Sequence, residues 1–202
     1  MRIRYLALGD SYTIGESVEE FERWPNQLAD FLKAGGIPTE VDIIARTGWT
    51  TKELWEGIQA QQVVPPYDLV SLLVGVNNQY RGYAINEYRE QFVFLLNKAV
   101  GYARGNPKHV IVLSIPDWGV TPFARGHDLE KIARDIDTFN MVNQEETEKA
   151  GAFYIDITPL SREAVQDPAL IASDGLHPSG KMYSEWAKLT YLAALKAVEI
   201  SQ

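Results

Sequence analysis

The chain has 202 residues, a net charge of −8 and no cysteine. The lack of cysteine excludes disulfides, thiolate metal sites and a cysteine nucleophile, and an acidic chain without a basic cluster argues against nucleic-acid binding. A chain of this length with 46% apolar residues can form one domain with a substantial core, so we expect residues 1–202 to form a single domain.

No stretch of the sequence approaches the ~18–20 apolar residues that span a membrane. The first residues, Met1–Tyr5, run directly into an apolar segment with no signal region before it. We therefore expect a cytoplasmic protein that does not bind membranes. The sequence leaves the oligomeric state open.

Apolar runs of strand length recur along the chain. They are rich in valine, isoleucine and leucine, and they are continuous rather than alternating, as is typical of parallel strands buried on both faces. The runs lie at 5–8, 41–45, 69–74, 110–115 and 152–155.

Segments between and after these runs repeat apolar residues at helical spacing, which predicts helices that pack against a core. The stripes are Trp24, Leu28, Phe31 and Leu32; Tyr88, Phe92, Leu95, Leu96 and Val100; Ile132, Ile136, Phe139 and Val142; and Trp186, Leu189, Leu192, Leu195 and Val198. Alternating strands and helices predict an α/β fold, a three-layer α/β/α sandwich around a parallel sheet.

Chemically interesting residues follow the predicted strands directly. Ser11 follows the first strand, Gly48 the second and Asn77 the third. Ligands of an open parallel sheet bind beyond the carboxyl ends of its strands, so these residues are expected to meet at one edge. His109 precedes the fourth strand, so we expect it at the opposite edge in a structural or exposed role.

An Asp-x-x-His segment near the other end of the chain supplies the partners that a serine nucleophile needs. A serine hydroxyl is a weak nucleophile until a base takes its proton, and the imidazole base needs a carboxylate to fix its tautomer. Asp174 lies three residues before His177, so it can reach Nδ1 across one turn. Ser11, His177 and Asp174 are therefore the candidate nucleophile, base and orienting acid.

Short blocks of sequence together resemble a known family. They are Gly9-Asp10-Ser11-Tyr12, Gly48, Gly75-Val76-Asn77-Asn78 and Asp174-Gly175-Leu176-His177-Pro178. In this order they are similar to the marker blocks of the SGNH hydrolases, the GDSL-type esterases and lipases. Tyr12 stands where that family usually has leucine, and Asn78 stands where it commonly has aspartate.

This resemblance implies a flavodoxin-like sandwich with strand order 2-1-3-4-5 and a serine hydrolase site. It also implies an oxyanion hole made by the backbone N–H groups of Ser11 and Gly48 and by the side-chain amide of Asn77. Preorganised donors of this kind usually make the largest single contribution to acyl transfer. Asp10, although next to the nucleophile, is interpreted as a scaffold residue that hydrogen-bonds the surrounding loops.

Loops at the same edge are expected to bind the substrate. Their candidate contact residues are Tyr12, Trp49, Asn78, Tyr80 and Trp118, and the same loops also contribute Arg81, Phe123 and Arg125. Aromatic side chains there can hold an acyl chain, an aryl group or a sugar face. His127 is expected to be an exposed loop residue, and neither a metal site nor a cofactor is predicted.

The sequence thus predicts a serine esterase for small-molecule esters, with short-chain carboxylic esters or carbohydrate acetyl esters as substrates. A thioesterase or lysophospholipase of the same mechanism remains an alternative. A non-catalytic module that binds carbohydrate or acyl ligands is another, although it has no need of the complete catalytic set.

Overall fold

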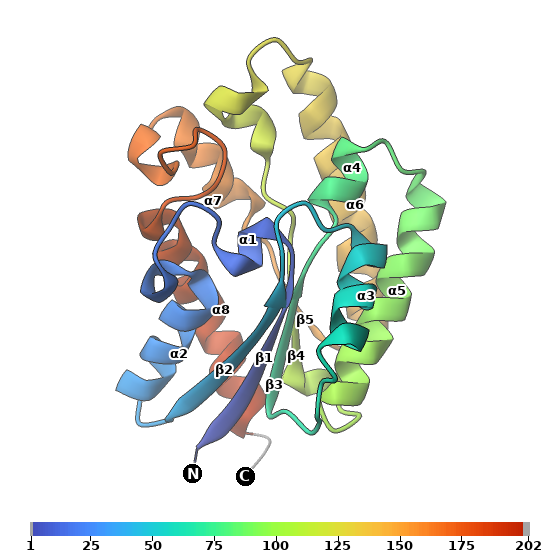
Figure 1. Ribbon diagram of the computed structural model, residues 1–202, viewed down its shortest axis with the longest axis vertical. Coiled ribbons are helices and arrows are strands. Elements are labelled where there is room, and N and C mark those ends of the chain that lie inside the picture. Colours follow the sequence, from blue (N-terminus) through green and yellow to red (C-terminus); the bar gives the residue numbers. More distant parts are fainter. Residues whose placement is uncertain (1, 200–202) are drawn as a thin grey trace.

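The computed structural model describes residues 2–199 and contains one sheet of five parallel strands (Figure 1). The strand order is β2-β1-β3-β4-β5, which confirms the order implied by the family resemblance. The strands are β1 (Ile3–Gly9), β2 (Thr39–Ala45), β3 (Leu69–Leu73), β4 (Val110–Leu113) and β5 (Phe153–Ile155).

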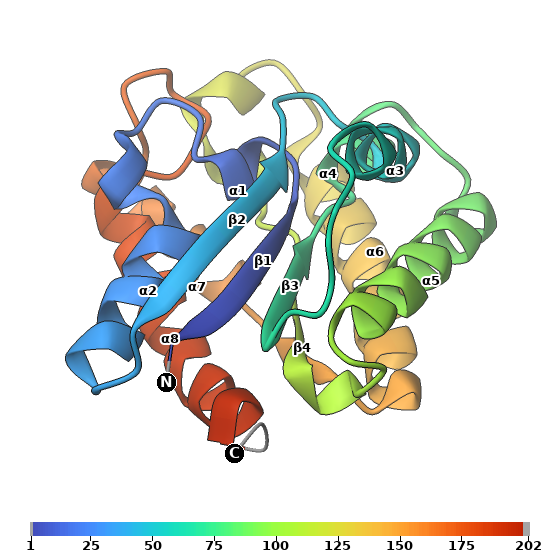
Figure 2. The same cartoon turned by 60° about the horizontal axis from the view of Figure 1, so that its bottom comes forward.

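Helices cover both faces of the sheet, which confirms the three-layer sandwich. Helices α2 and α8 lie on one side, and α3, α5 and α6 lie on the other (Figure 2). The helices are α1 (Ser11–Ile14), α2 (Trp24–Ala34), α3 (Thr51–Ala60), α4 (Val76–Tyr80), α5 (Ile85–Tyr102), α6 (Leu129–Ala150), α7 (Thr158–Arg162) and α8 (Gly180–Glu199).

The predicted burial on both faces holds for the centre of the sheet but not for its edges. Every residue of β3 and β4 is buried. In β1 every residue is buried except Arg4, which is half-buried. From Thr39 to Ile43 half-buried and exposed residues of β2 alternate, Ile44 is its one buried residue, and β5 is half-buried throughout. Both are edge strands, which explains why they are only partly covered.

Helix α3 has no apolar stripe as clear as the others, and its start depends on local hydrogen bonds. The Thr50 side chain accepts from the Glu53 backbone N–H, while the Glu53 carboxylate accepts from the Thr50 N–H. This reciprocal capping box satisfies donors at the helix start that have no partner within the helix. It also fixes where the loop after β2 ends.

The stripe predicted for α8 was wrong at two of its five positions, Leu189 and Leu192, whereas Trp186 and Val198 are buried and Leu195 packs against the core. Leu189 is 45% exposed and Leu192 67% exposed, whereas Ala187 and Ala194 are fully buried. Helix α8 packs closely against α2, and small alanines permit that approach, while Tyr183 and Trp186 are buried in the core beside them. Leu189 and Leu192 therefore lie on the outer face of the helix.

Candidate active site

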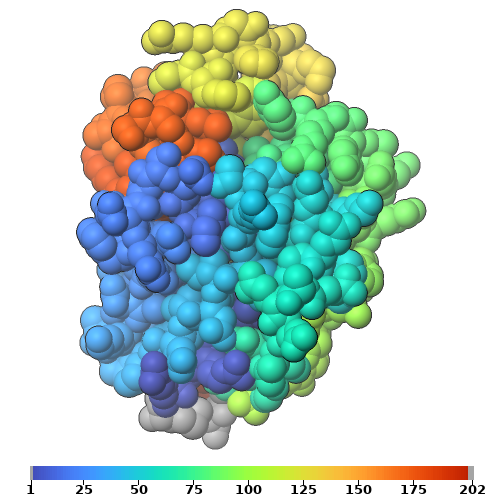
Figure 3. All heavy atoms as spheres, viewed as in Figure 1, coloured from blue at the N-terminus to red at the C-terminus, as the bar shows by residue number. Residues whose placement is uncertain are grey.

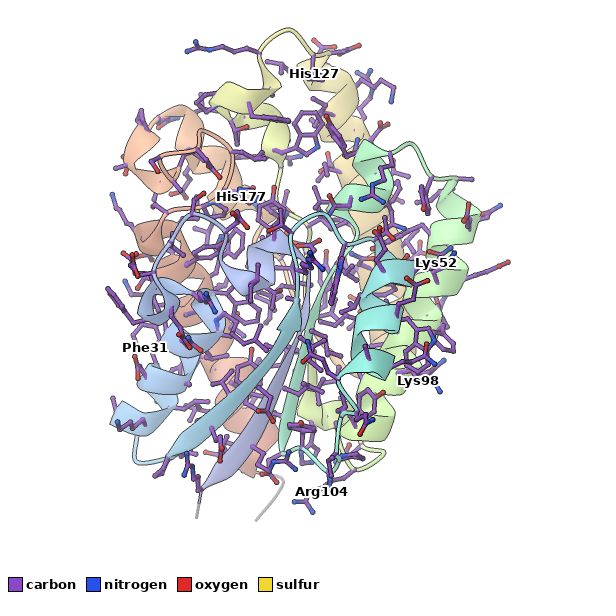
Figure 4. All side chains as sticks on the ribbon, viewed as in Figure 1. Phe31, Lys52, Lys98, Arg104, His127 and His177 are labelled. Atoms are coloured by element: carbon purple, nitrogen blue, oxygen red, sulfur yellow. The ribbon has the colours of Figure 1, made fainter. Side chains whose placement is uncertain are left out.

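The predicted site residues converge at the carboxyl ends of the central strands. Ser11 begins α1 directly after β1, Gly48 lies in the loop between β2 and α3, and Asn77 lies in α4 after β3. His177 lies in the segment before α8, and Figure 4 places its side chain beside α1. Ser11, Gly48, Asn77 and His177 line one pocket.

Asp174 and His177 form a compact turn. The His177 Nδ1 atom lies 2.6 Å from Asp174 Oδ2. Asp174 Oδ1 accepts the backbone N–H groups of Leu176 and His177 at 2.9 and 3.0 Å. The carboxylate therefore fixes both the backbone of the turn and the ring of its own histidine.

Asp174 is held in its ionised form. Partial burial raises the pKa of this carboxyl, but hydrogen bonds from the His177 ring, the two backbone N–H groups and the Ser17 hydroxyl outweigh burial and lower the pKa to about 2. An ionised Asp174 accepts a hydrogen bond from Nδ1–H of His177, so the other ring nitrogen, Nε2, is the one that can act as a base.

The turn that carries Ser11 is almost fully buried. Ser11 is only 5% exposed, and Asp10 is completely buried. Asp10 Oδ1 accepts the Tyr12 backbone N–H at 3.1 Å and so caps α1. The Tyr12 ring meets His177 edge-on, with the ring centroids 5.6 Å apart. Asp10 thus supports the nucleophile turn, and Tyr12 packs against the base.

The backbone at the proposed oxyanion hole adopts conformations that favour glycine. Gly48 has φ +84° and Gly75 has φ +134°, a region that side chains rarely tolerate. A Cβ atom on Gly75 would also lie 2.4 Å from the Tyr88 hydroxyl. These two glycines let the loops after β2 and β3 approach the pocket closely.

Helix α4 holds the loop after β2 through consecutive contacts. The Asn77 side-chain amide donates to the Trp49 carbonyl at 2.9 Å, and its second N–H is not used by that bond. The Arg81 guanidinium donates to the Gly48 carbonyl at 2.6 Å and forms an ion pair with Glu53. The segments that carry Gly48 and Asn77 are therefore bonded to each other.

Asn78 completes this contact and accounts for the missing family aspartate. Its Oδ1 atom accepts the Thr51 backbone N–H at 3.1 Å, and its Nδ2 atom donates to the Thr51 hydroxyl at 2.8 Å. The Thr51 hydroxyl in turn bonds Gln91. An aspartate could only accept at this position, whereas asparagine both accepts and donates.

The pocket has a volume of about 160 Å³. Tyr12, Tyr80 and Trp118 line it, as expected. Asn78 is buried against Thr51, and the Trp49 indole packs on Gly57 of α3. The structure therefore places these two expected contact residues away from the pocket.

Phe123, from the loop after β4, lines the pocket as the sequence led us to expect. Thr47, Val76 and Leu176 also line it, but they were not singled out as substrate contacts from the sequence. Val76 and Leu176 lie inside the sequence blocks that carry Asn77 and His177, so their position beside catalytic candidates is the signal that points to them. Nothing comparable in the local sequence distinguishes Thr47.

The remaining histidines lie outside this pocket. His109 is buried at the opposite end of the sheet, where Nδ1 lies 2.9 Å from the Asp68 carbonyl oxygen. His127 is exposed in the loop after β4, apart from His177 (Figure 4). Within residues 2–199, no group of three or more acidic or histidine side chains is arranged to hold a metal ion. No helix in this range is long and apolar enough to cross a membrane.

Comparison with known proteins identifies the family. The profile of the GDSL-like lipase/acylhydrolase family matches residues 7–184. The protein belongs to this family, whose fold and sequence blocks it shares.

A curated relative and several solved structures are similar to the chain. An acetylxylan esterase of Geobacillus stearothermophilus is 24% identical over 142 residues. That match covers 66% of this chain and 62% of the relative, so the chain spans just under two thirds of the curated protein it matches.

The structural neighbours share the fold over nearly the whole chain. TesA has a TM-score of 0.73 at 19% identity, covering 96% of this chain and 99% of its own. The psychrotrophic esterase EstA of Pseudoalteromonas sp. has a TM-score of 0.72 at 17% identity, covering 97% and 98%. The acetylxylan esterase Axe2 of G. stearothermophilus has a TM-score of 0.69 at 20% identity, covering 97% and 94%.

Proposed function

We propose that the protein is a serine esterase that hydrolyses short acyl esters through an acyl-enzyme intermediate. The observation that carries the proposal is the 2.6 Å contact between Asp174 and His177, in a histidine that lines the same small pocket as Ser11. A carboxylate, an imidazole and a hydroxyl in this arrangement form a nucleophilic triad.

In the acylation step, the Ser11 hydroxyl attacks the ester carbonyl carbon and His177 Nε2 takes the hydroxyl proton. The tetrahedral intermediate collapses when His177 returns this proton to the leaving alcohol. Water then attacks the acyl-serine, again giving its proton to His177, and the carboxylic acid leaves as Ser11 regains its hydrogen. Asp174 stays ionised and stabilises the imidazolium in both steps.

The negative charge on the carbonyl oxygen needs donors in a site that is poor in water. The backbone N–H groups of Ser11 and Gly48 and the free N–H of Asn77 are the candidate donors. The contacts of α4 with the loop after β2 support this role, because they fix the donor-bearing segments before the substrate arrives.

The size of the pocket favours a short acyl group. Pockets for drug-sized ligands usually have volumes of ~300–1,000 Å³, and this one has about 160 Å³. An acetyl or butyryl group suits that space. The acetylxylan esterase relative supports acetyl esters of carbohydrates within this class.

A thioesterase or lysophospholipase of the same mechanism is the second candidate. Both chemistries use the same triad, but a lysophospholipase needs an apolar groove for a long chain, which the small pocket does not offer. A non-catalytic binding module is the weakest candidate, since binding alone does not require a carboxylate-oriented histidine beside a buried serine.

Covalent labelling combined with ester hydrolysis tests the proposal. A fluorophosphonate should modify Ser11 alone, as read by peptide mass spectrometry, and Ser11→Ala should abolish both labelling and hydrolysis of 4-nitrophenyl acetate. Ser161 is the matched control, because it is equally buried but bonds to Thr158 and Asp117. Modification of Ser161, or full activity in Ser11→Ala, would remove Ser11 from the mechanism.

A further inference from the structure

A second, larger hollow opens beside the catalytic pocket. It has a volume of about 680 Å³ and lies between α4, the loop after β4 and α6. Tyr80 and Trp118 line both this groove and the catalytic pocket. The segment after β4, yellow in Figure 3, lies at the top of the molecule in that view. The catalytic pocket and the groove are therefore neighbours that share one wall.

The shared wall consists of two aromatic side chains, Tyr80, which is 53% exposed, and Trp118, which belongs to the core and is 5% exposed. The Tyr80 ring lies 5.4 Å from Trp118, and His127 lies 5.3 Å from Trp118 on the groove side. His127 is exposed as well, whereas Phe123 lines only the catalytic pocket. The exposed rings of Tyr80 and His127 offer flat faces to a ligand in the groove.

Polar groups form the other side of the groove. Gln79 is only 8% exposed, and its Oε1 atom accepts the Trp118 indole N–H at 2.9 Å. Its Nε2 atom donates a long hydrogen bond of 3.4 Å to Asp135 Oδ2. The Lys131 ammonium group donates to the same oxygen at 2.5 Å. The amide, the carboxylate and the ammonium group all keep hydrogen-bonding capacity beyond these contacts.

Resting on the proposed esterase function, we propose that this groove is the subsite for the alcohol part of the ester and that this part is a carbohydrate. Sugar rings present apolar C–H faces to aromatic walls and hydroxyl groups to carboxylates and amides, which matches the two sides of the groove. The volume lies within the usual range for ligand pockets. A lipid chain would leave the polar side unsatisfied.

The charges of the groove oppose an anionic ligand. Asp128 and Asp135 line it, and Lys131 is the one lysine or arginine among its lining side chains, where it already forms an ion pair with Asp135. A phosphorylated or carboxylated alcohol would face an unbalanced carboxylate. The subsite therefore suits a neutral sugar.

The kinetic test compares an acetylated xylo-oligosaccharide with 4-nitrophenyl acetate. Asp135→Ala removes a carboxylate that would accept hydrogen bonds from sugar hydroxyls. Thr138→Trp fills part of the groove with an indole, from a position that is exposed and lines the groove. Each should lower the ratio of kcat/KM for the sugar ester to kcat/KM for the nitrophenyl ester by about tenfold, the equivalent of one hydrogen bond. Glu130→Ala is the matched control, because its side chain is 90% exposed on the same helix and it does not line the groove.

Binding separates the subsite from the catalytic proposal. In the Ser11→Ala background, calorimetry with the same acetylated oligosaccharide should show a dissociation constant about tenfold weaker with Asp135→Ala or Thr138→Trp than without them. Unchanged binding and unchanged kinetic ratios in both variants would overturn the subsite while leaving an active esterase intact. Selective loss of binding in a protein that hydrolyses no ester would overturn the esterase and retain the sugar-binding groove.

Discussion

Asp10 makes the stability of the protein depend on pH in a way that can be measured. Its side chain is completely buried, one oxygen bonds the Tyr12 N–H and the other has no hydrogen-bond partner. Burial raises the pKa of Asp10 from its ordinary 3.8 to about 7, while the hydrogen bond from the Tyr12 backbone limits the rise. The folded protein thus holds this proton more tightly than the unfolded chain does.

The sign and size of the effect follow from proton linkage. A raised pKa contributes stability that is fully present below pH 3.8 and is lost as the pH rises through about 7. Between pH 5 and pH 8 the free energy of unfolding should fall by about 2.5 kcal/mol because of this one group. Tyr12, Tyr88 and Tyr183 interact with Asp10, but burial raises the pKa of each phenol, so they do not titrate in this range.

Urea unfolding of the wild type and Asp10→Asn at pH 5 and pH 8 measures this contribution. The variant keeps an oxygen for the Tyr12 N–H but cannot titrate. The free energy of unfolding of the variant minus that of the wild type should therefore be about 2.5 kcal/mol higher at pH 8 than at pH 5. A difference between the two proteins that is the same at both pH values would show that Asp10 is ionised throughout and refute the reasoning.

Other predictions concern the site directly. Asn77→Ala should lower kcat by ~10²–10³ with little change in KM, equivalent to about 2.7–4 kcal/mol; a rise confined to KM would make Asn77 a substrate-binding residue instead. Asp174→Asn should reduce kcat less than Ser11→Ala, because the turn still holds His177, and wild-type activity in this variant would exclude Asp174 from the triad. Across 4-nitrophenyl esters from C2 to C12 without detergent, kcat/KM should be highest at acetyl or butyryl, and a maximum at C8 or longer would contradict the small pocket. EDTA should leave activity unchanged; loss that a divalent cation restores would show that a metal takes part.

Much of the fold could be predicted because local pattern and tertiary structure agree. Continuous apolar runs located every strand, and the residues after β1, β2 and β3 met at one edge because parallel strands place their carboxyl ends together. The contact between Asp174 and His177 was predictable because it closes within one turn. Such contacts need no knowledge of distant segments.

The failures involve interactions that the sequence does not encode locally. Leucine is more apolar than alanine, so Leu189 and Leu192 were assigned to the inner face of α8 in place of Ala187 and Ala194, although Trp186 and Val198 were placed correctly. Trp49 was expected to contact substrate, yet the absence of a side chain at Gly57 gives its ring a place on α3. The larger groove lies between α4 and α6, whose residues Gln79 and Asp135 are 56 residues apart in the sequence, so no local motif predicts it.

The bonds from α4 to the loop after β2 have a consequence for engineering this protein. Gly48, Trp49 and Thr51 are held by Arg81, Asn77 and Asn78 respectively. A loop taken from a relative would lack the α4 side chains that hydrogen-bond it, and an α4 taken from a relative would not fit the hydrogen-bonding groups of this loop. These two segments therefore form a single exchangeable module, and chimaeras should replace them together.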